Sequence, residues 1–222
     1  MQVRRPCGHP VIFNSTTVDV VANMELLRET AEACNLILDH THFQIRLLSK
    51  SYRLPKLIAD NLISERHHRR IIFGFSTGTL DDKVAKAIET GTPLVSHRLK
   101  SLHWLQDRGL RTFGMIFPSL PQTDHASFSR EICDAIRATD CEHVWAEVIN
   151  LRGKSLQRTL DGLSRHRLLT EAEMMKAVSG PGSTARWDEY ARATFETPPP
   201  MFRRKNSGFS NMWRKEPIPG GH

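Results

Sequence analysis

The sequence lacks closely spaced cysteines, long apolar runs and the common glycine-rich catalytic motifs. Its four cysteines, Cys7, Cys34, Cys133 and Cys141, form neither a CxxC nor a CxxxCxxC pattern. The spacing therefore indicates no metal or iron–sulfur site built from adjacent cysteines. No run of about 18 apolar residues is present, so no transmembrane helix is expected. Neither GxSxG, a Walker A loop nor GxGxxG occurs.

The first residues, MQVRRPCGHPVIF, contain an apolar run that is too short for a secretory signal. We therefore expect a cytoplasmic protein, in which disulfides are uncommon. A chain of 222 residues is long enough for one full domain with a short appendage, and it can bury a core without disulfides.

The chain is basic, with 31 lysines and arginines against 24 aspartates and glutamates. The resulting formal charge of +7 permits a polyanionic partner such as nucleic acid, although many basic proteins merely carry a solvated basic surface. We expect no membrane partner.

Five short apolar segments recur along the chain, and each is rich in β-branched or aromatic residues. They are Pro10–Ser15, Phe43–Ser49, Arg70–Ser76, Thr112–Pro118 and His143–Ile149. Helical patterns lie between them, which is typical of strand–helix units that form a parallel sheet. The sequence thus predicts an α/β fold of about five parallel strands, too few for a complete eight-stranded barrel, so that a partial (β/α) barrel or an open α/β sheet fits.

Capping residues predict where several helices begin. Asn23 and Asp124 precede amphipathic segments as N-caps, Thr79–Asp82 resembles a capping box, and Ser96 is expected to cap the next helix.

The pattern changes after Arg152, which divides the chain into three parts. Residues 1–152 form the predicted partial barrel, and residues 153–197 are predicted to form a helical appendage. Residues 198–222 form a basic, Pro/Gly-rich tail that we expect to be mobile. Its aromatic and basic residues favour either nucleic-acid contact or, more simply, a loosely packed tail.

Polar side chains gather where the predicted strands end. Because the carboxyl ends of parallel strands meet at one edge, ligand groups collect there. The residues expected at this shared site are Asn14, Ser15, Thr16, Lys50, Ser76 and Glu147.

Glu147 lies inside the apolar segment HVWAEVI and is expected to face the barrel interior. A buried carboxylate needs a partner, and Lys50 or Arg152 could supply it. A ligand contact is the alternative, and an acid/base pair of Glu147 with Lys50 is a third interpretation.

Several segments together resemble the radical S-adenosylmethionine (radical SAM) proteins of the spore photoproduct lyase and DNA-repair-photolyase-like group. The group's S-x-T-T-L-D motif corresponds to Ser76–Asp81, and its E-P-G-x-P segment corresponds to Glu89–Pro93 with Thr90 in place of proline. The match also includes Arg98–Leu99, Pro118 through Pro121, and Ser49–Lys50–Ser51, which is similar to T-K-S. The resemblance covers roughly Val11 to Arg152.

The resemblance implies a partial barrel that uses S-adenosylmethionine and a [4Fe–4S] cluster to generate a 5′-deoxyadenosyl radical. It implies that Lys50 and Ser76 contact the methionine or ribose part of the cofactor, and that Asn14–Thr17 meet its amino group. The catalytic residues and the substrate remain open.

This sequence departs from the group at one decisive point, because the cluster-binding CxxxCxxC motif is absent. In the group that motif follows the first barrel strand, and the five strands predicted here correspond to the second through the sixth. The chain is therefore expected to be either the remainder of a radical SAM enzyme, inactive alone, or a non-catalytic relative that binds nucleic acid or a partner.

Overall fold

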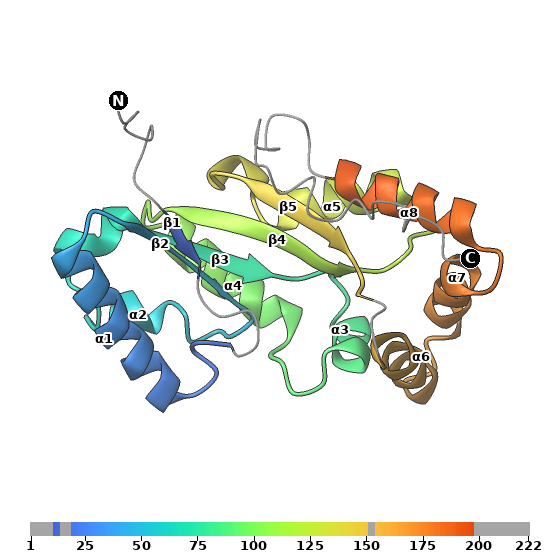
Figure 1. Ribbon diagram of the computed structural model, residues 1–222, viewed down its shortest axis with the longest axis horizontal. Helices are drawn as coiled ribbons and strands as arrows, with labels where there is room; N and C mark the ends of the chain where they lie inside the picture. Colours follow the sequence, from blue (N-terminus) through green and yellow to red (C-terminus); the bar gives the residue numbers. More distant parts are fainter. Residues whose placement is uncertain (1–10, 14–18, 151–153, 198–222) are drawn as a thin grey trace, which may run out of the picture.

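The computed structural model describes residues 11–13, 19–150 and 154–197, and its centre is one parallel β-sheet (Figure 1). The sheet contains β1 (Val11–Phe13), β2 (Gln44–Ser49), β3 (Ile71–Ser76), β4 (Thr112–Ser119) and β5 (Val144–Val148). All five predicted strands are confirmed.

Strands and helices alternate as far as β5, and the helices between strands are the crossovers that parallel pairing requires. The helices are α1 (Met24–His40), α2 (Lys56–Ala59), α3 (Asp82–Ile88), α4 (Val95–Gln106), α5 (His125–Ala135), α6 (Ser155–Arg165), α7 (Leu169–Ser179) and α8 (Thr184–Glu196), with 3-10 turns η1 (Glu65–Arg70) and η2 (Ala138–Asp140).

The strand order is β1-β2-β3-β4-β5, and every neighbouring pair is parallel. A doubly wound sheet reverses its strand order at a switch point, whereas a βα barrel adds each strand beside the previous one. The observed order follows the barrel rule. Within the described residues the sheet does not close on itself.

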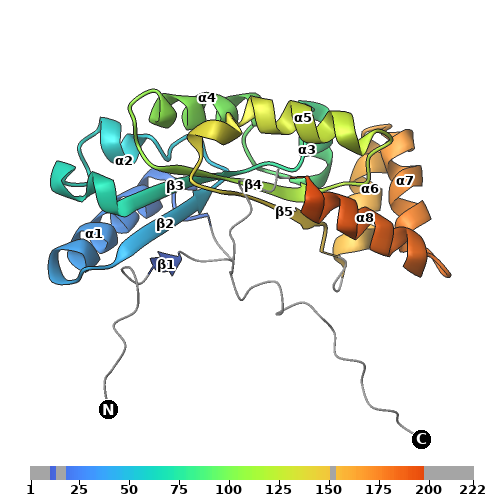
Figure 2. The same ribbon diagram turned by 90° about the horizontal axis from the view of Figure 1, so that it is seen from above.

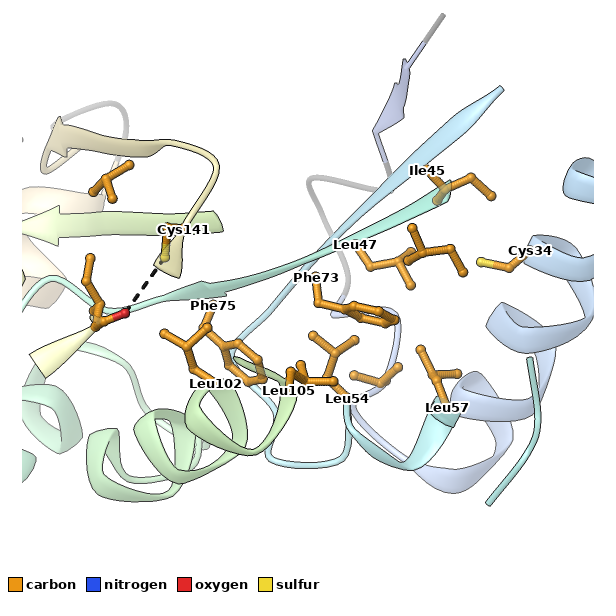
Figure 3. Close-up of a cluster of buried hydrophobic side chains, with 14 of the residues drawn as sticks. Cys34, Ile45, Leu47, Leu54, Leu57, Phe73, Phe75, Leu102, Leu105 and Cys141 are labelled. Carbon is orange, nitrogen blue, oxygen red and sulfur yellow. Dashed lines mark hydrogen bonds between the residues drawn. The ribbon is translucent and has the colours of Figure 1, made fainter. Parts of the chain in front are cut away.

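The main hydrophobic core lies between the sheet and the helices on one of its faces (Figures 2 and 3). Ile45, Leu47, Phe73 and Phe75 project from β2 and β3 into this core. They pack with buried helix side chains that include Leu27 and Leu38 of α1, Leu57 of α2, Leu102 and Leu105 of α4, and Ile132 of α5. Because neighbouring residues of a strand point to opposite faces, Arg46 lies on the other face of the sheet.

That other face carries an aromatic group around the Arg46 guanidinium. The guanidinium lies 5.7 Å from the ring centroid of Phe113 and 5.3 Å from that of Trp145. The His143 ring stacks on Phe113 at 5.1 Å between centroids. These contacts place a positive charge against aromatic faces, which favours its burial.

Two of the predicted caps are confirmed and two are wrong. Asn23 accepts a hydrogen bond from Leu26 N at 2.8 Å, and Asp124 accepts one from Ser127 N at 2.9 Å. The cap of α3 is Asp81 rather than Thr79. Ser96 lies inside the first turn of α4, and the carboxylate of Asp82 caps that helix from a distance, accepting from Val95 N at 2.7 Å.

Helices α6, α7 and α8 share a second core with the sheet domain. Leu163 of α6, Met175 of α7 and Tyr190 of α8 are buried with Val84 and Ala87 of α3. The Tyr190 hydroxyl donates to Ser119 O and accepts from Ile149 N at 3.2 Å, so α8 is fixed to the ends of β4 and β5. Burial raises the pKa of Tyr190 to about 12, which keeps this hydroxyl protonated.

Gly162 permits the close contact of α6 with α3. A Cβ atom at this position would lie 2.1 Å from Ala87 O, which is too close for any side chain. Glycine normally weakens the interior of a helix, so its presence here is explained by packing.

We therefore expect Gly162→Ala to destabilise the protein, by about 1–3 kcal/mol in the free energy of unfolding, because α6 must move away from α3. Chemical denaturation measures this change. The matched control is Ser164→Ala in the same helix, where the side chain is exposed and the expected change is within about 0.5 kcal/mol. Stabilisation by Gly162→Ala would contradict the contact.

Candidate functional site at the carboxyl edge of the sheet

Asp19 fixes the end of β2. Its carboxylate accepts hydrogen bonds from Ser49 Oγ and from Lys50 N, both at 2.8 Å, and from Val21 N at 3.1 Å. The three donors come from two segments that are far apart in the sequence. Asp19 therefore ties the approach to α1 to the carboxyl end of β2, directly beside Lys50.

The Lys50 ammonium group is held by Glu89, with which it forms an ion pair. It also lies 5.6 Å from the ring centroid of Phe117, near the end of β4. The Lys50 side chain is 24% exposed, whereas that of Glu89 is only 6% exposed. Because an ammonium has more donors than one carboxylate contact uses, Lys50 can still bind an anionic or carbonyl group from solvent.

Glu89 in turn is held by Arg98, whose side chain is 1% exposed. Arg98 Nη2 lies 2.6 Å from Glu89 Oε2 and donates to Thr92 Oγ1 at 2.8 Å. Nε donates to Pro93 O at 3.0 Å, and Nη1 donates to Ser76 O at 2.9 Å. The guanidinium thus joins the carboxyl end of β3 to the loop before α4.

Ser76 joins β3 to β4 at the same edge. Its hydroxyl is buried and donates to Phe117 O at 2.9 Å, so the proton of this hydroxyl is already used within the protein. Two residues later, a Cβ atom at Gly78 would lie 1.7 Å from Pro118 O. This close approach requires glycine, and it holds the loop after β3 against the end of β4.

Val144 and Ala146 pack in the core on the helix side, so strand alternation places Glu147 on the opposite face of β5, the face predicted to line the barrel. The prediction differs in burial, because the Glu147 side chain is exposed on that face. Neighbouring protein atoms still restrict its hydration and raise its pKa above the ordinary glutamate value. Lys50 pairs with Glu89, and within the described residues Glu147 has no ion pair. The suggested Lys50 partner for Glu147 is therefore wrong, since a nearer carboxylate occupies that amine.

The structure brings Lys50 and Ser76 together around the Glu89–Arg98 pair. Asn14, Ser15 and Thr16 lie outside the described residues, as does Arg152.

The described cysteines do not fit an iron–sulfur cluster. Cys34, Cys133 and Cys141 are buried and free, and burial raises the pKa of the Cys34 thiol to about 12 and that of Cys141 to about 11. Cluster ligands are thiolates, whereas these thiols remain protonated. In the described ranges, no three His, Cys, Asp or Glu side chains are grouped to hold a metal ion, and Cys7 lies outside them.

The pattern of polar residues at strand ends predicted neither Glu89 nor Arg98 as a site residue. Both belong to the segments that carried the family resemblance, which was the available signal. The ends of the strands do not indicate these two residues, because Glu89 follows α3 and Arg98 lies within α4.

We expect Arg98→Lys to lower the free energy of unfolding by about 2–4 kcal/mol, because lysine cannot reach all four acceptors and leaves Glu89 under-neutralised in the interior. Urea denaturation tests this. The control is Arg28→Lys at an exposed position of α1, with a change within about 0.5 kcal/mol. If the two substitutions change the free energy of unfolding equally, the buried network does not stabilise the carboxyl edge of the sheet.

No family model matches the sequence, and no curated protein matches it. Solved structures match in fold. A cysteine-to-serine mutant of spore photoproduct lyase superposes with a TM-score of 0.53 at 14% identity, over 80% of this chain and 61% of that chain. Spore photoproduct lyase complexed with dinucleoside spore photoproduct gives 0.50 at 14% identity, with the same coverage.

A double mutant of that enzyme with bound AdoMet and dinucleoside spore photoproduct gives a TM-score of 0.51 at 14% identity. This chain spans 61% of the length of these structures. At this identity the likeness establishes the fold. The predicted α/β architecture is thereby confirmed, and the chain shares its fold with spore photoproduct lyase over the matched part.

Proposed function

We propose that this chain is the barrel portion of a photolyase-like radical SAM protein and that it binds S-adenosylmethionine at the carboxyl edge of its sheet. The observation that carries the proposal is the partly exposed Lys50 ammonium, held at that edge by a buried ion pair. The structural neighbour with bound AdoMet supports this choice of ligand.

Lys50 would bind the carboxylate of the methionine part, because a charged hydrogen bond to a carboxylate is among the stronger polar contacts. Ser76 would offer lone pairs and hold β3 against β4, and Glu89 with Arg98 would keep the Lys50 amine in place. Asn14, Ser15, Thr16 and Glu147 complete the proposed cofactor site. When bound, S-adenosylmethionine supplies a sulfonium that can be cleaved reductively.

The residues present do not fit the cluster that would deliver the electron, since the sequence has no CxxxCxxC and its described thiols are buried and protonated. We therefore propose that this chain does not cleave S-adenosylmethionine by itself. In this proposal residues 1–152 form the partial barrel, 153–197 the helical appendage and 198–222 a basic tail.

The second candidate function is a non-catalytic relative that binds nucleic acid. Its support is the formal charge of +7 and a structural neighbour complexed with a dinucleoside. Nucleic-acid binding that weakens steeply with salt would favour it. Neither candidate involves a membrane, and no helix in the described ranges is long and apolar enough to cross one.

We expect isothermal titration calorimetry to detect S-adenosylmethionine binding, and Lys50→Gln to weaken it roughly ten- to a hundred-fold, as loss of a charged hydrogen bond predicts. Lys56→Gln is the matched control, because Lys56 pairs on the surface with Asp60 at 3.4 Å. Binding that is unchanged in Lys50→Gln, or absent in the wild type, would refute the proposed site.

We also expect the 222-residue chain to form no stable iron–sulfur chromophore after anaerobic reconstitution with iron and sulfide, and to release no 5′-deoxyadenosine. Absorption spectroscopy and chromatography measure the two quantities. A spore photoproduct lyase treated in parallel provides the positive control. A stable cluster spectrum from this chain would show that its cysteines suffice after all.

A further inference from the structure

We propose that Tyr52, Arg53 and His97 form a stacking surface for an unpaired base of single-stranded nucleic acid. The inference deepens the proposed function, because it rests on a nucleic-acid partner and names the side chains that would bind it. It does not depend on S-adenosylmethionine binding.

The Tyr52 ring is exposed and contacts Arg53 and His97. It is 44% exposed, one of five large hydrophobic side chains exposed in the described part of the chain. The Arg53 guanidinium lies 4.8 Å from its ring centroid, and the His97 ring meets it edge-on at 6.2 Å and 81°. The other four, Met24, Leu36, Leu169 and Phe195, have no cation or ring contact with the described residues.

The loop that carries Tyr52 is held firmly on both sides of the exposed ring. Ser51 is 2% exposed and Leu54 is fully buried, so the backbone is anchored in the domain. Ser101 Oγ of α4 donates to Tyr52 O at 3.3 Å, and Arg53 Nη1 donates to Ala22 O at 2.9 Å. An aromatic ring on an anchored loop loses little further freedom when a ligand stacks on it.

The stacking surface borders the candidate functional site. Tyr52 follows Lys50 by two residues, and His97 directly precedes the buried Arg98. Lys100 is exposed one turn further along α4 and adds positive charge on the same face of that helix as His97. A strand of nucleic acid could therefore place a base on Tyr52 and its phosphates near Arg53 and Lys100, beside the carboxyl edge.

This combination favours a single strand over a duplex or an acidic protein. Every base offers a flat face to an aromatic ring, and a base inside a duplex is already stacked on its neighbours. Arg53 can stack on Tyr52 and still attract a phosphate, because its charge spreads over a planar group. An acidic peptide would use the charges, but it could stack on the exposed ring only where it carries an aromatic side chain, whereas every nucleotide carries a base.

Fluorescence anisotropy with labelled oligothymidylate and oligouridylate of about 12 nucleotides at low salt tests the inference. We expect Tyr52→Ala to weaken binding roughly 5- to 150-fold, which corresponds to the loss of one stacked base. Tyr52→Phe keeps the ring and should stay within about twofold of the wild type. Arg53→Gln should reduce the slope of affinity against salt by about one.

Phe195→Ala is the matched control, because this phenylalanine is 50% exposed on α8 and its ring makes no cation–π contact with the described residues. The affinity of the Phe195→Ala variant for the oligonucleotides should equal that of the wild type. Tyr52→Leu, which retains apolar bulk but removes the aromatic face, should also weaken binding, and it replaces Tyr52→Ala if that variant fails to fold. The two oligonucleotides show whether DNA or RNA is preferred.

Wild-type affinity in Tyr52→Ala and Tyr52→Leu would overturn the stacking surface and leave the nucleic-acid partner standing. Absence of binding by the wild type at low salt would overturn both of these, while the proposed S-adenosylmethionine site would still be judged by calorimetry with Lys50→Gln.

Discussion

The burial of Glu89 with Arg98 is the interaction on which the carboxyl edge of this sheet depends. A charged group in the protein interior is tolerated only when it is paired and its hydrogen bonds are satisfied. Arg98 meets this condition by reaching four acceptors in two segments, Ser76 at the end of β3 and Glu89, Thr92 and Pro93 in the loop after α3. The position of each segment is therefore fixed by the other.

One charged group of this network, the Lys50 ammonium, is partly exposed to solvent. Lys50 is bound to Glu89 from inside the domain, and its side chain is partly exposed at the point where the ends of β2, β3 and β4 come together. Asp19 fixes the backbone at this residue, and the following loop presents Tyr52. The network that stabilises the edge thus also positions the two groups that we propose bind a ligand, an ammonium for a carboxylate and a ring for a base.

The C-terminal helices are part of the same architecture. Helix α6 packs against α3 through Gly162, and Tyr190 of α8 connects the ends of β4 and β5. Helix α3 connects the end of β3 to the Glu89 loop, and the C-terminal helices share a core with α3. Their packing therefore stabilises the carboxyl edge of the sheet through α3. The helices after Arg152 therefore share a hydrophobic core with the elements that precede them.

The sequence by itself determined the five strands, most of the helices and the parallel order of the sheet. These features depend on local periodicity, on caps such as Asn23 and Asp124, and on the short spacing that allows each strand to pair with the previous one. It also placed Lys50 and Ser76 at one edge, because the ends of parallel strands must meet. It did not determine which carboxylate would reach Lys50. Glu147 was the carboxylate visible in a strand, yet it is exposed, whereas Glu89 is carried into the interior by the loop after α3. That choice depends on how α3 and α4 pack on the sheet and on the need of the buried Arg98 for a negative partner, and only the tertiary structure brings those groups together.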